Sequence, residues 1–389
     1  MKDDTLIVTE GRDPKSNFGV VNPPVYHAST IIFPTLDALE ESLSKPWEGV
    51  HYGRQGTPTT FALHDAMAAL EGGARGIATS SGLAAASAAL TAFVEAGDHV
   101  LVTDSVYGPT RRFCERMLRK FGVEVTFYDP LIGSDIARLL RTDTRVVFTE
   151  SPGSLTFEVQ DIPAIAAAAH AAGAVVINDN TWATPLYFKS FQHGVDVSVH
   201  AATKYIVGHA DAMLGVIVTT EETYVPVKTA AALNGHCAGP DDVYLGLRGF
   251  RTLSVRLARH QESARRIAEW LTGRREVARV LYPALPDDPG HAIWKRDFLG
   301  ASGLLGFILD RPYRREALAA MLDGMKLFAM GESWGGYESL LLPRNPTPLR
   351  TATSWSPPGP LLRAHVGLED PDDLIADLEA GFARLEAAA

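Results

Sequence analysis

Cysteine is scarce in this 389-residue sequence, which contains only Cys114 and Cys237. The two stand in no CxxC or Cys/His spacing, so we expect neither a disulfide scaffold nor a zinc site. Apolar runs of the ~20 residues that a membrane-spanning helix needs are also absent. The first residues, Met1-Lys2-Asp3-Asp4, carry acids where a signal peptide has an apolar segment. These absences predict a cytoplasmic protein with no membrane partner.

Basic residues are not in excess either. The chain has 36 Lys and Arg against 46 Asp and Glu, and its net charge is −10. Such a chain is a poor binder of nucleic acid and of anionic membrane surfaces. Hydrophobic residues make up 46% and charged residues 21%, which is the mix of an ordinary globular protein. The length predicts two or three domains, and a two-domain enzyme is the default interpretation.

Residues 1–57 are rich in Pro, Gly, Asn and Thr and show no sustained periodicity. We interpret them as an extended N-terminal arm. An arm without a core of its own has to pack on another surface, and we expect that surface to belong to a second subunit.

Residues 58–245 alternate between helical patterns and short apolar runs, which predicts an α/β domain with a mainly parallel sheet. The predicted strands are 99–103, 123–128, 145–149, 174–177, 195–199 and 214–219. The predicted helices are 58–70, an Ala-rich helix that follows Gly82 and ends near residue 94, 110–121 and 162–172. Residues 246–389 predict a smaller α+β domain, connected by a long helix that runs from about residue 240 to residue 271. Its predicted strands are 277–281, 304–309, 327–330 and 362–366, and its other helices are 315–322 and 372–386.

Ser80-Ser81-Gly82-Leu83 directly opens one of the predicted helices. Backbone N–H groups at a helix N-terminus, with hydroxyls and a glycine for close approach, form a site for an anion such as phosphate. The absence of a lysine after the glycine excludes a Walker loop. A plain serine cap of the helix is the alternative interpretation.

Asp179 follows the apolar run 174–177 and therefore lies at the carboxyl end of a predicted strand, where ligands bind in such sheets. A carboxylate at that edge could hold Mg²⁺, accept a phosphoryl group or pair with a cationic ring nitrogen. Capping of a turn is the alternative.

Lys204 follows the next strand, 195–199, and precedes the apolar residues Tyr205-Ile206-Val207. Apolar surroundings lower the pKa of a lysine, as an amine nucleophile requires. Thr203 beside it could offer a hydroxyl to a phosphate. A phosphate cradle, a strand-end aspartate and a desolvated lysine together match the needs of pyridoxal 5′-phosphate (PLP). The lysine would form the Schiff base, the aspartate would keep the pyridine nitrogen protonated, and the helix N-terminus would hold the phosphate.

The motifs resemble, in the same order along nearly the whole chain, those of the Cys/Met-metabolism family of PLP enzymes, the cystathionine β- and γ-lyase group. The stretch 201–211 resembles the lysine signature of the family, and 179–182 resembles its pyridinium-aspartate motif. Near the C-terminus, 333–339 and 363–367 look like its substrate-carboxylate elements. The resemblance implies the PLP-dependent transferase fold of aspartate-aminotransferase type (fold type I). The large domain then binds PLP, and the C-terminal domain carries the substrate-carboxylate site.

The resemblance also implies roles for the residues that match the motifs. Catalysis is assigned to Lys204, as Schiff-base lysine and general base, and to Tyr107, which stacks on the cofactor ring. The further cofactor-binding residues are Gly82, Leu83, Asp179, Thr203, Tyr52 and Arg54. The residues that bind the amino-acid substrate are Ser333, Trp334 and Arg363.

Tyr52-Gly53-Arg54 resembles the arm motif that reaches the phosphate of a neighbouring subunit. The resemblance therefore implies a homo-oligomer, a tetramer assembled as a dimer of catalytic dimers.

Two features favour the bacterial cystathionine β-lyase branch of the family: Trp334 before Gly-Gly, and Ser151-Pro152-Gly153-Ser154 in place of a Ser-Pro-x-Asn-Pro pattern. The implied function is α,β-elimination of L-cystathionine to homocysteine, pyruvate and ammonia, a transsulfuration step of methionine biosynthesis. Related cysteine S-conjugates and cystine are implied as further substrates. A γ-acting relative (cystathionine γ-lyase, methionine γ-lyase or γ-synthase) is the alternative, and a regulator with little turnover is another.

A different class of function competes through Gly331-Glu332-Ser333-Trp334-Gly335, which satisfies the G-x-S-x-G pattern of serine hydrolases. Ser333, Glu338 and His365 have the chain order of such a triad. A helix should follow the serine at once, however, and Gly335-Gly336 is a poor helix start.

Two residue groups predict no site. His193 and His200 are seven residues apart, which is no recognised metal-ligand spacing, and we predict no metal ligand in the chain. The cluster Arg111, Arg112, Arg116, Arg119 and Lys120 predicts a solvated helix face.

Overall fold

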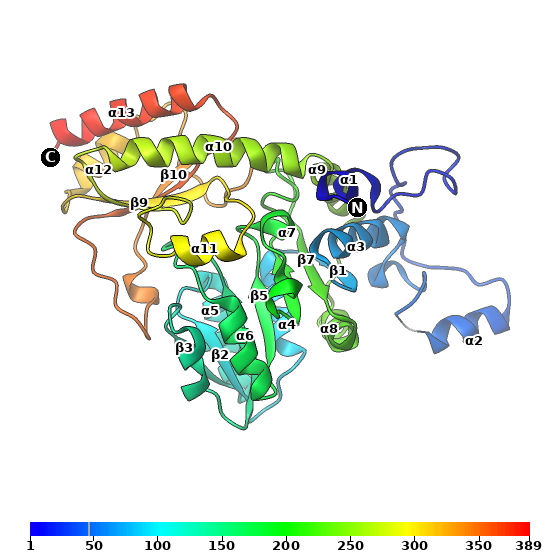
Figure 1. Cartoon of the computed structure of the whole chain (residues 1–389). Helices are drawn as coiled ribbons and strands as arrows, with labels where there is room; N and C mark the ends of the chain where they lie inside the picture. Colours follow the sequence, from blue (N-terminus) through cyan, green and yellow to red (C-terminus); the bar gives the residue numbers. More distant parts are fainter. Residues whose placement is uncertain (46) are drawn as a thin grey trace.

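The computed structural model describes residues 1–45 and 47–389 (Figure 1). The helices are α1 (Asp3–Thr9), α2 (Leu36–Ser44), α3 (Pro58–Glu71), α4 (Gly82–Thr91), α5 (Gly108–Phe113), α6 (Ile162–Ala171), α7 (Thr184–Tyr187), α8 (Glu221–Leu233), α9 (Pro240–Phe250), α10 (Leu253–Thr272), α11 (His291–Asp297), α12 (Arg315–Leu322) and α13 (Pro371–Ala387). The strands are β1 (Arg75–Thr79), β2 (His99–Thr103), β3 (Glu124–Tyr128), β4 (Thr144–Glu150), β5 (Val175–Asp179), β6 (Val197–His200), β7 (Gly215–Thr219), β8 (Val277–Leu281), β9 (Leu304–Leu309), β10 (Leu340–Arg344) and β11 (Leu361–His365).

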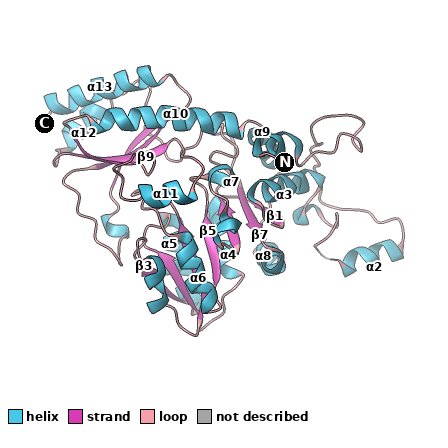
Figure 2. Cartoon of the chain, in the orientation of Figure 1, coloured by secondary structure: helices cyan, strands magenta, loops and turns pink. Residues whose placement is uncertain are grey.

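The large sheet has seven strands in the order β1-β7-β6-β5-β4-β2-β3. Strands β2 to β6 pair in parallel, whereas β7 runs antiparallel to both β1 and β6. The predicted α/β fold with a mainly parallel sheet is confirmed. Helices lie on both faces of this sheet (Figure 2), so its strands are buried on both sides and read as continuous apolar runs.

The C-terminal part forms a four-stranded antiparallel sheet in the order β10-β11-β9-β8. Helices α10 and α13 extend alongside each other over it (Figure 1). Their apolar side chains join one buried cluster with those of β9, β11, α6 and β4. The smaller α+β domain is therefore confirmed, and its core is continuous with one face of the large sheet.

Some predicted elements are wrong. Residues 327–330 form no strand, because the Asp377 carboxylate accepts the N–H groups of Lys326, Leu327 and Phe328 at 2.7–3.1 Å and bends the chain. A single bridge from Ala329 to Leu340 is formed instead. The predicted continuous helix after residue 240 is two helices, α9 and α10. Strands β1 and β10 and helices α1, α2, α7, α8 and α11 were not predicted.

The cluster of basic side chains after Gly108 is only partly a solvated face. Arg112, Arg116, Arg119 and Lys120 are exposed, as predicted. The prediction is wrong for Arg111, which is 2% exposed. It forms an ion pair with the buried carboxylate of Asp104 at 3.0 Å, and its guanidinium lies 3.6 Å from the ring centroid of Phe127. A buried arginine needs such partners, and they come from elsewhere in the fold.

The N-terminal segment is not uniformly an extended arm. Helix α1 packs on the chain itself, since Ile7 is buried in the cluster formed by α3, and Arg251 donates to the Ile7 carbonyl at 2.7 Å. Among the described residues from 8 to 55, none is buried. Helix α2 stands away from the rest of the chain (Figure 1). The described part of this segment therefore contributes no buried side chain to the core.

Candidate active site

Lys204 lies in the turn that follows β6. Its side chain is largely enclosed, with Nζ donating to Ser333 Oγ and lying 5.4 Å from the ring centroid of Trp334. Burial, reinforced by the cation of Arg363, lowers the pKa of Lys204 from 10.5 to about 8, while Glu332 and Asp179 oppose that change. The low pKa agrees with the expectation from the apolar sequence around it. Lys204 is therefore an amine with a sizeable uncharged fraction near neutral pH.

Asp179 ends β5, the strand beside β6. Its Oδ1 accepts both the backbone N–H of Thr181 at 3.0 Å and the Thr181 hydroxyl at 2.5 Å. No described residue donates to Oδ2. Burial raises the pKa of Asp179, whereas the Thr181 hydrogen bonds and the nearby Lys204 lower it. One carboxylate oxygen is thus fixed, and the other is free to accept a proton-bearing group of a ligand.

The N-terminus of α4 packs directly against the turn that carries Lys204. The backbone of Gly82 approaches so closely that a Cβ there would lie 2.4 Å from the Cβ of Ala201, which explains the glycine. Ser81 caps the helix by accepting the N–H of Ala84 at 3.1 Å. The N–H groups of Gly82 and Leu83 find no acceptor among the described residues, and they remain available to an anion.

Thr203, the other residue predicted at the phosphate site, is half-buried. Its hydroxyl donates to the carbonyl of Leu214 at 3.1 Å and lies 2.9 Å from the Leu214 N–H. The hydroxyl therefore connects the turn that carries Lys204 to Leu214, directly before β7. A contact of Thr203 with a phosphate stays a prediction.

Arg363 occupies β11 and reaches the same region from the C-terminal domain. Its Nη2 donates to the carbonyl of Ser333 at 2.9 Å, and no described carboxylate pairs with it. Burial and the nearby Arg344 lower its pKa to about 10. Ser333 itself has φ +77°, an unusual conformation that holds its hydroxyl toward Lys204. A buried guanidinium without a carboxylate is suited to the carboxylate of a substrate.

Tyr107 is the N-cap residue directly before α5 and is 46% exposed. Burial raises the pKa of its hydroxyl, and the carboxyl groups of Glu150 and Asp179 raise it further. Its backbone N–H donates to Glu150 Oε2 at 2.6 Å. The ring of Tyr107 thus belongs to the same edge of the sheet as Asp179.

Glu150 is a site residue that the sequence reasoning missed. It ends β4 directly opposite Asp179 on β5. Burial, followed by the negative charge of Asp179, raises the pKa of Glu150 well above its ordinary value. The signal was present in the sequence, because Glu150 follows an apolar strand at the same carboxyl edge as Asp179.

Tyr52 and Arg54 are not brought to this site within one chain. Tyr52 is 46% exposed, and Arg54 donates to the carbonyl of Ala232 in α8 at 2.8 Å. Among the described residues no hydrogen bond joins either to Lys204, to Asp179 or to the start of α4. Their position leaves the role in a neighbouring subunit as a prediction.

The Ser333 hydrolase alternative does not have its geometry. The Ser333 hydroxyl is bonded to Lys204, while His365 Nε2 accepts the N–H of Gly335 at 3.1 Å. A loop follows the serine, where an elbow needs a helix. No hydrogen bond among the described residues links Ser333 to His365 or His365 to Glu338, so the triad is not assembled.

The arrangement fits PLP in three respects. The lysine has an enclosed amine of lowered pKa, and the aspartate has one free oxygen. The helix N-terminus, whose glycine packs against the lysine turn, offers N–H groups to a phosphate. In the described part of the chain, no group of three or more His, Cys, Asp or Glu could hold a metal ion, and no helix there is long and apolar enough to cross a membrane.

Comparison with known proteins agrees with this geometry. The model of the family described as "Cys/Met metabolism PLP-dependent enzyme" matches residues 4–383. A putative cystathionine beta-lyase of Rhizobium johnstonii is 52% identical over 98% of this chain and 96% of its own. Cystathionine beta-lyase MetC of Escherichia coli is 46% identical over 98% of each chain. The crystal structure of cystathionine gamma synthase from Xanthomonas oryzae pv. oryzae superimposes with a TM-score of 0.91 at 32% identity, over 100% of both chains.

Proposed function

The chain belongs to the Cys/Met metabolism family of PLP-dependent enzymes, and from that premise we propose that it is a carbon–sulfur β-lyase acting on L-cystathionine. The products are homocysteine, pyruvate and ammonia. The observation that carries the proposal is the convergence of three groups from different elements. They are the Lys204 amine, Oδ2 of Asp179, which accepts from no described residue, and the Arg363 guanidinium, which pairs with no described carboxylate.

The cofactor would be held by residues already described. Lys204 would bind its aldehyde covalently, Asp179 would accept the N–H of its ring, and the N-terminus of α4 would bind its phosphate. Tyr107 would lie against the ring. When bound, PLP supplies an electron-withdrawing ring that stabilises negative charge developing on the substrate Cα.

The protein orients the substrate through its carboxylate. Arg363 offers a bidentate pair to that carboxylate at a buried position, where charge-assisted hydrogen bonds are strong. The guanidinium is held in place by the Ser333 carbonyl. This contact directs the amino group and the Cα–H of the substrate toward Lys204, which hydrogen-bonds to the hydroxyl of the same serine.

Lys204 then moves the protons of the reaction. Its uncharged amine accepts the proton from Cα as general base, and the resulting ammonium can donate that proton to the sulfur that departs from Cβ. The Cβ–S bond breaks, and homocysteine leaves as a thiol. The remaining three-carbon fragment takes up water and releases ammonia and pyruvate.

Elimination at Cβ rather than Cγ is favoured by the comparisons. The relative at 46% identity is named cystathionine beta-lyase and the one at 52% "Putative cystathionine beta-lyase", whereas the γ-synthase is 32% identical. Trp334, beside Lys204, is one of the two sequence features that point the same way.

The experiment is to incubate the holoenzyme with L-cystathionine and identify both products. Pyruvate and homocysteine in equal amounts are expected, whereas 2-oxobutyrate and cysteine would mean γ-elimination and overturn the proposal. Lys204→Ala should abolish both the product and the borohydride-reducible absorption band of the bound cofactor. Lys295→Ala, which changes an exposed lysine, is the matched control and should retain both.

For the assembly, we propose a homotetramer of two catalytic dimers in which Tyr52 and Arg54 complete the site of a neighbour. The described residues between 8 and 55, none of which is buried, support this, with Phe18 99% and Ile32 89% exposed in the single chain. Mixing inactive Lys204→Ala and Arg54→Ala chains should restore roughly a quarter of the wild-type activity, since half of the dimers then carry one intact site of two. Absence of any recovery would refute a shared site.

A cytoplasmic location is the setting we propose. Cys114 and Cys237 are both free thiols, which a reducing compartment maintains. Fractionation of cells that produce the full-length protein tests this, and recovery in a secreted or membrane fraction would contradict it.

A further inference from the structure

A segment of the C-terminal domain, residues 345–355, bridges the two ends of the site. We call it the strap. It leaves β10, whose Leu342 lies opposite Arg363 on β11. At its root, Arg344 forms an ion pair with Glu332, the neighbour of Ser333, at 2.5 Å. The start of the strap is therefore part of the structure that holds the substrate-carboxylate residues.

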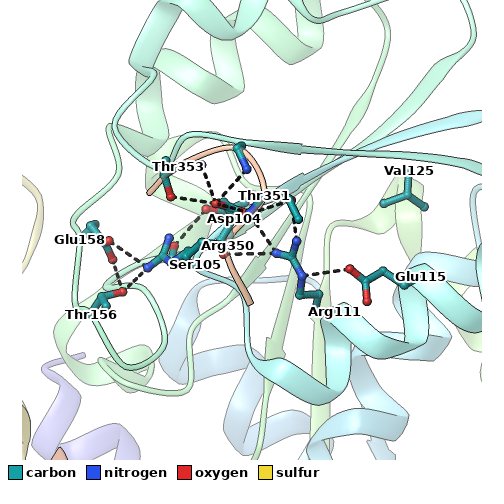
Figure 3. Close-up of polar contacts among 12 residues, drawn as sticks. Asp104, Ser105, Arg111, Glu115, Val125, Thr156, Glu158, Arg350, Thr351 and Thr353 are labelled. Carbon is teal, nitrogen blue, oxygen red and sulfur yellow. Dashed lines mark hydrogen bonds and ion pairs between the residues drawn. The ribbon is translucent and has the colours of Figure 1, made fainter. Parts of the chain in front are cut away.

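The far end of the strap is fastened to the large domain by Asp104 (Figure 3). Oδ2 of Asp104 accepts the N–H of Ala352 at 3.1 Å and both the N–H and the hydroxyl of Thr353, at 2.9 and 2.8 Å. Oδ1 accepts the N–H of Thr351 at 3.0 Å and Nη1 of Arg111 at 3.0 Å. Arg111 also donates to the Thr351 hydroxyl at 2.6 Å. The Asp104 side chain has no exposed surface, and every one of its partners in the strap lies about 250 positions away.

A second ion pair fastens the strap to the loop after β4. The side chain of Arg350 is 4% exposed and donates to Glu158 at 2.9 Å and to the Thr156 hydroxyl. The carbonyl of Glu158 accepts the N–H of Gly153 at 2.9 Å. The loop that is held in this way begins directly after Glu150, whose carboxylate bonds to Tyr107.

The fastening is rigid and charged. Burial opposes ionisation of Asp104, but hydrogen bonds from Thr351, Thr353 and Arg111 hold the pKa of Asp104 below its ordinary value. A buried ion pair adds little net stability compared with well-packed apolar side chains, although removing one partner is costly. Its directional hydrogen bonds do impose one arrangement of the strap, and Asp104 stands only three residues before Tyr107.

We propose that Asp104 is a positioning residue: by locking the strap onto the large domain beside Tyr107, it holds Tyr107 and Arg363 at the separation that a bound amino acid requires. The two residues lie on different domains, and the strap runs from β10, which pairs with the strand that carries Arg363, to Asp104, three residues before Tyr107. Arg111 and Thr353 both donate to Asp104, and Arg111 also holds the strap directly through the Thr351 hydroxyl. This inference rests on the proposed function only in that Arg363 binds the carboxylate of an amino acid.

Asp104→Asn tests the inference because it keeps the size of the side chain but removes its charge. Asp135→Asn, at an exposed ion pair with Arg138 in the same domain, is the matched control. Hydrogen exchange of the strap amides in the apoenzyme should accelerate at least tenfold in Asp104→Asn and stay unchanged in the control. In the holoenzyme, the KM for L-cystathionine and the dissociation constant for L-alanine, measured from the cofactor spectrum, should both rise about 10-fold, because misplacement of binding groups weakens their joint contact.

Thr353→Val provides a milder variant that removes one hydroxyl donor, and it keeps the test open if Asp104→Asn does not fold. It should move exchange and affinity in the same direction by a smaller factor. Faster strap exchange with unchanged KM and L-alanine affinity would show a purely structural role and overturn the inference. Unchanged hydrogen exchange of the strap amides in Asp104→Asn would show that Asp104 does not hold the strap and would also overturn the inference. If the wild type released no pyruvate but the L-alanine affinity still fell in Asp104→Asn, the proposed function would fail and the positioning role would stand.

Discussion

The pKa of Lys204 is the property of this site that a titration measures most directly. Its lowering from 10.5 to about 8 comes first from burial and then from Arg363. At pH 7 an amine of pKa 8 is about one-tenth uncharged, whereas a solvated lysine is uncharged in roughly 0.03% of molecules. Only the uncharged amine attacks an aldehyde. At pH 7, the uncharged, reactive fraction of Lys204 in the apoenzyme should therefore be about 300-fold larger than that of a surface lysine.

The pH dependence follows with a definite sign. Because lowering the pKa lets the amine lose its proton at lower pH, the rate of PLP attachment should rise about tenfold per pH unit below pH 8 and level off above it. Arg363→Met removes a neighbouring cation and should shift the midpoint to higher pH. Glu332→Gln removes a neighbouring anion and should shift it to lower pH.

The assay is stopped-flow absorbance of apoenzyme mixed with PLP over a range of pH. Borohydride trapping and mass spectrometry then show that the modified peptide contains Lys204. Lys204→Ala reports the background from surface lysines. A midpoint near the ordinary value of 10.5, or a shift in the same direction for Arg363→Met and Glu332→Gln, would refute the reasoning.

Three other substitutions give separate tests of the site. Asp179→Asn should still bind PLP but lower kcat by about 100-fold or more, because a neutral amide cannot balance a protonated ring nitrogen; a wild-type kcat would remove Asp179 from that role. Arg363→Met should raise KM by roughly 10- to 150-fold, which corresponds to the loss of a charge-assisted hydrogen bond of about 1.5–3 kcal/mol. An unaltered KM in steady-state kinetics would contradict the role of Arg363 in binding the substrate carboxylate. Gly335→Ala should destabilise the fold by about 1–2 kcal/mol, because φ is +87°, and its Cβ would lie 2.9 Å from the backbone of Lys204. Denaturant unfolding measures this loss of stability, and kcat should fall as well. A Gly335→Ala variant with wild-type kcat and stability would show that the close approach of Gly335 to Lys204 is unimportant.

The errors in the predicted elements have a common physical origin. Strand β1 was not predicted because Arg75–Thr79 is short and contains Gly76. A glycine is required at that position, since a Cβ there would lie 2.5 Å from the backbone of His64. Residues 327–330 have the composition of a strand, but the Asp377 carboxylate, about fifty positions away, accepts the N–H groups of Leu327 and Phe328. In both cases a distant segment decides the outcome, and a local pattern does not contain it.

The sequence by itself determined the kinds of chemical group and their order. An apolar run followed by a polar residue places Asp179 and Lys204 at the carboxyl ends of neighbouring strands, because parallel strands end at one edge. The start of α4 could be read in the same way from Ser81 and Gly82. These features depend on residues close together in the chain.

Only the tertiary structure decided which groups act on one another. It placed Ser333, 129 positions away, beside Lys204, and it brought the strap to Asp104. It also left Arg363 with no carboxylate partner in the part of the chain that the structure describes. It also buried Arg111, which the sequence alone assigned to solvent. The reason is physical: desolvation and charge pairing depend on everything that surrounds a group in space, whereas periodicity and motif spacing report only its neighbours along the chain.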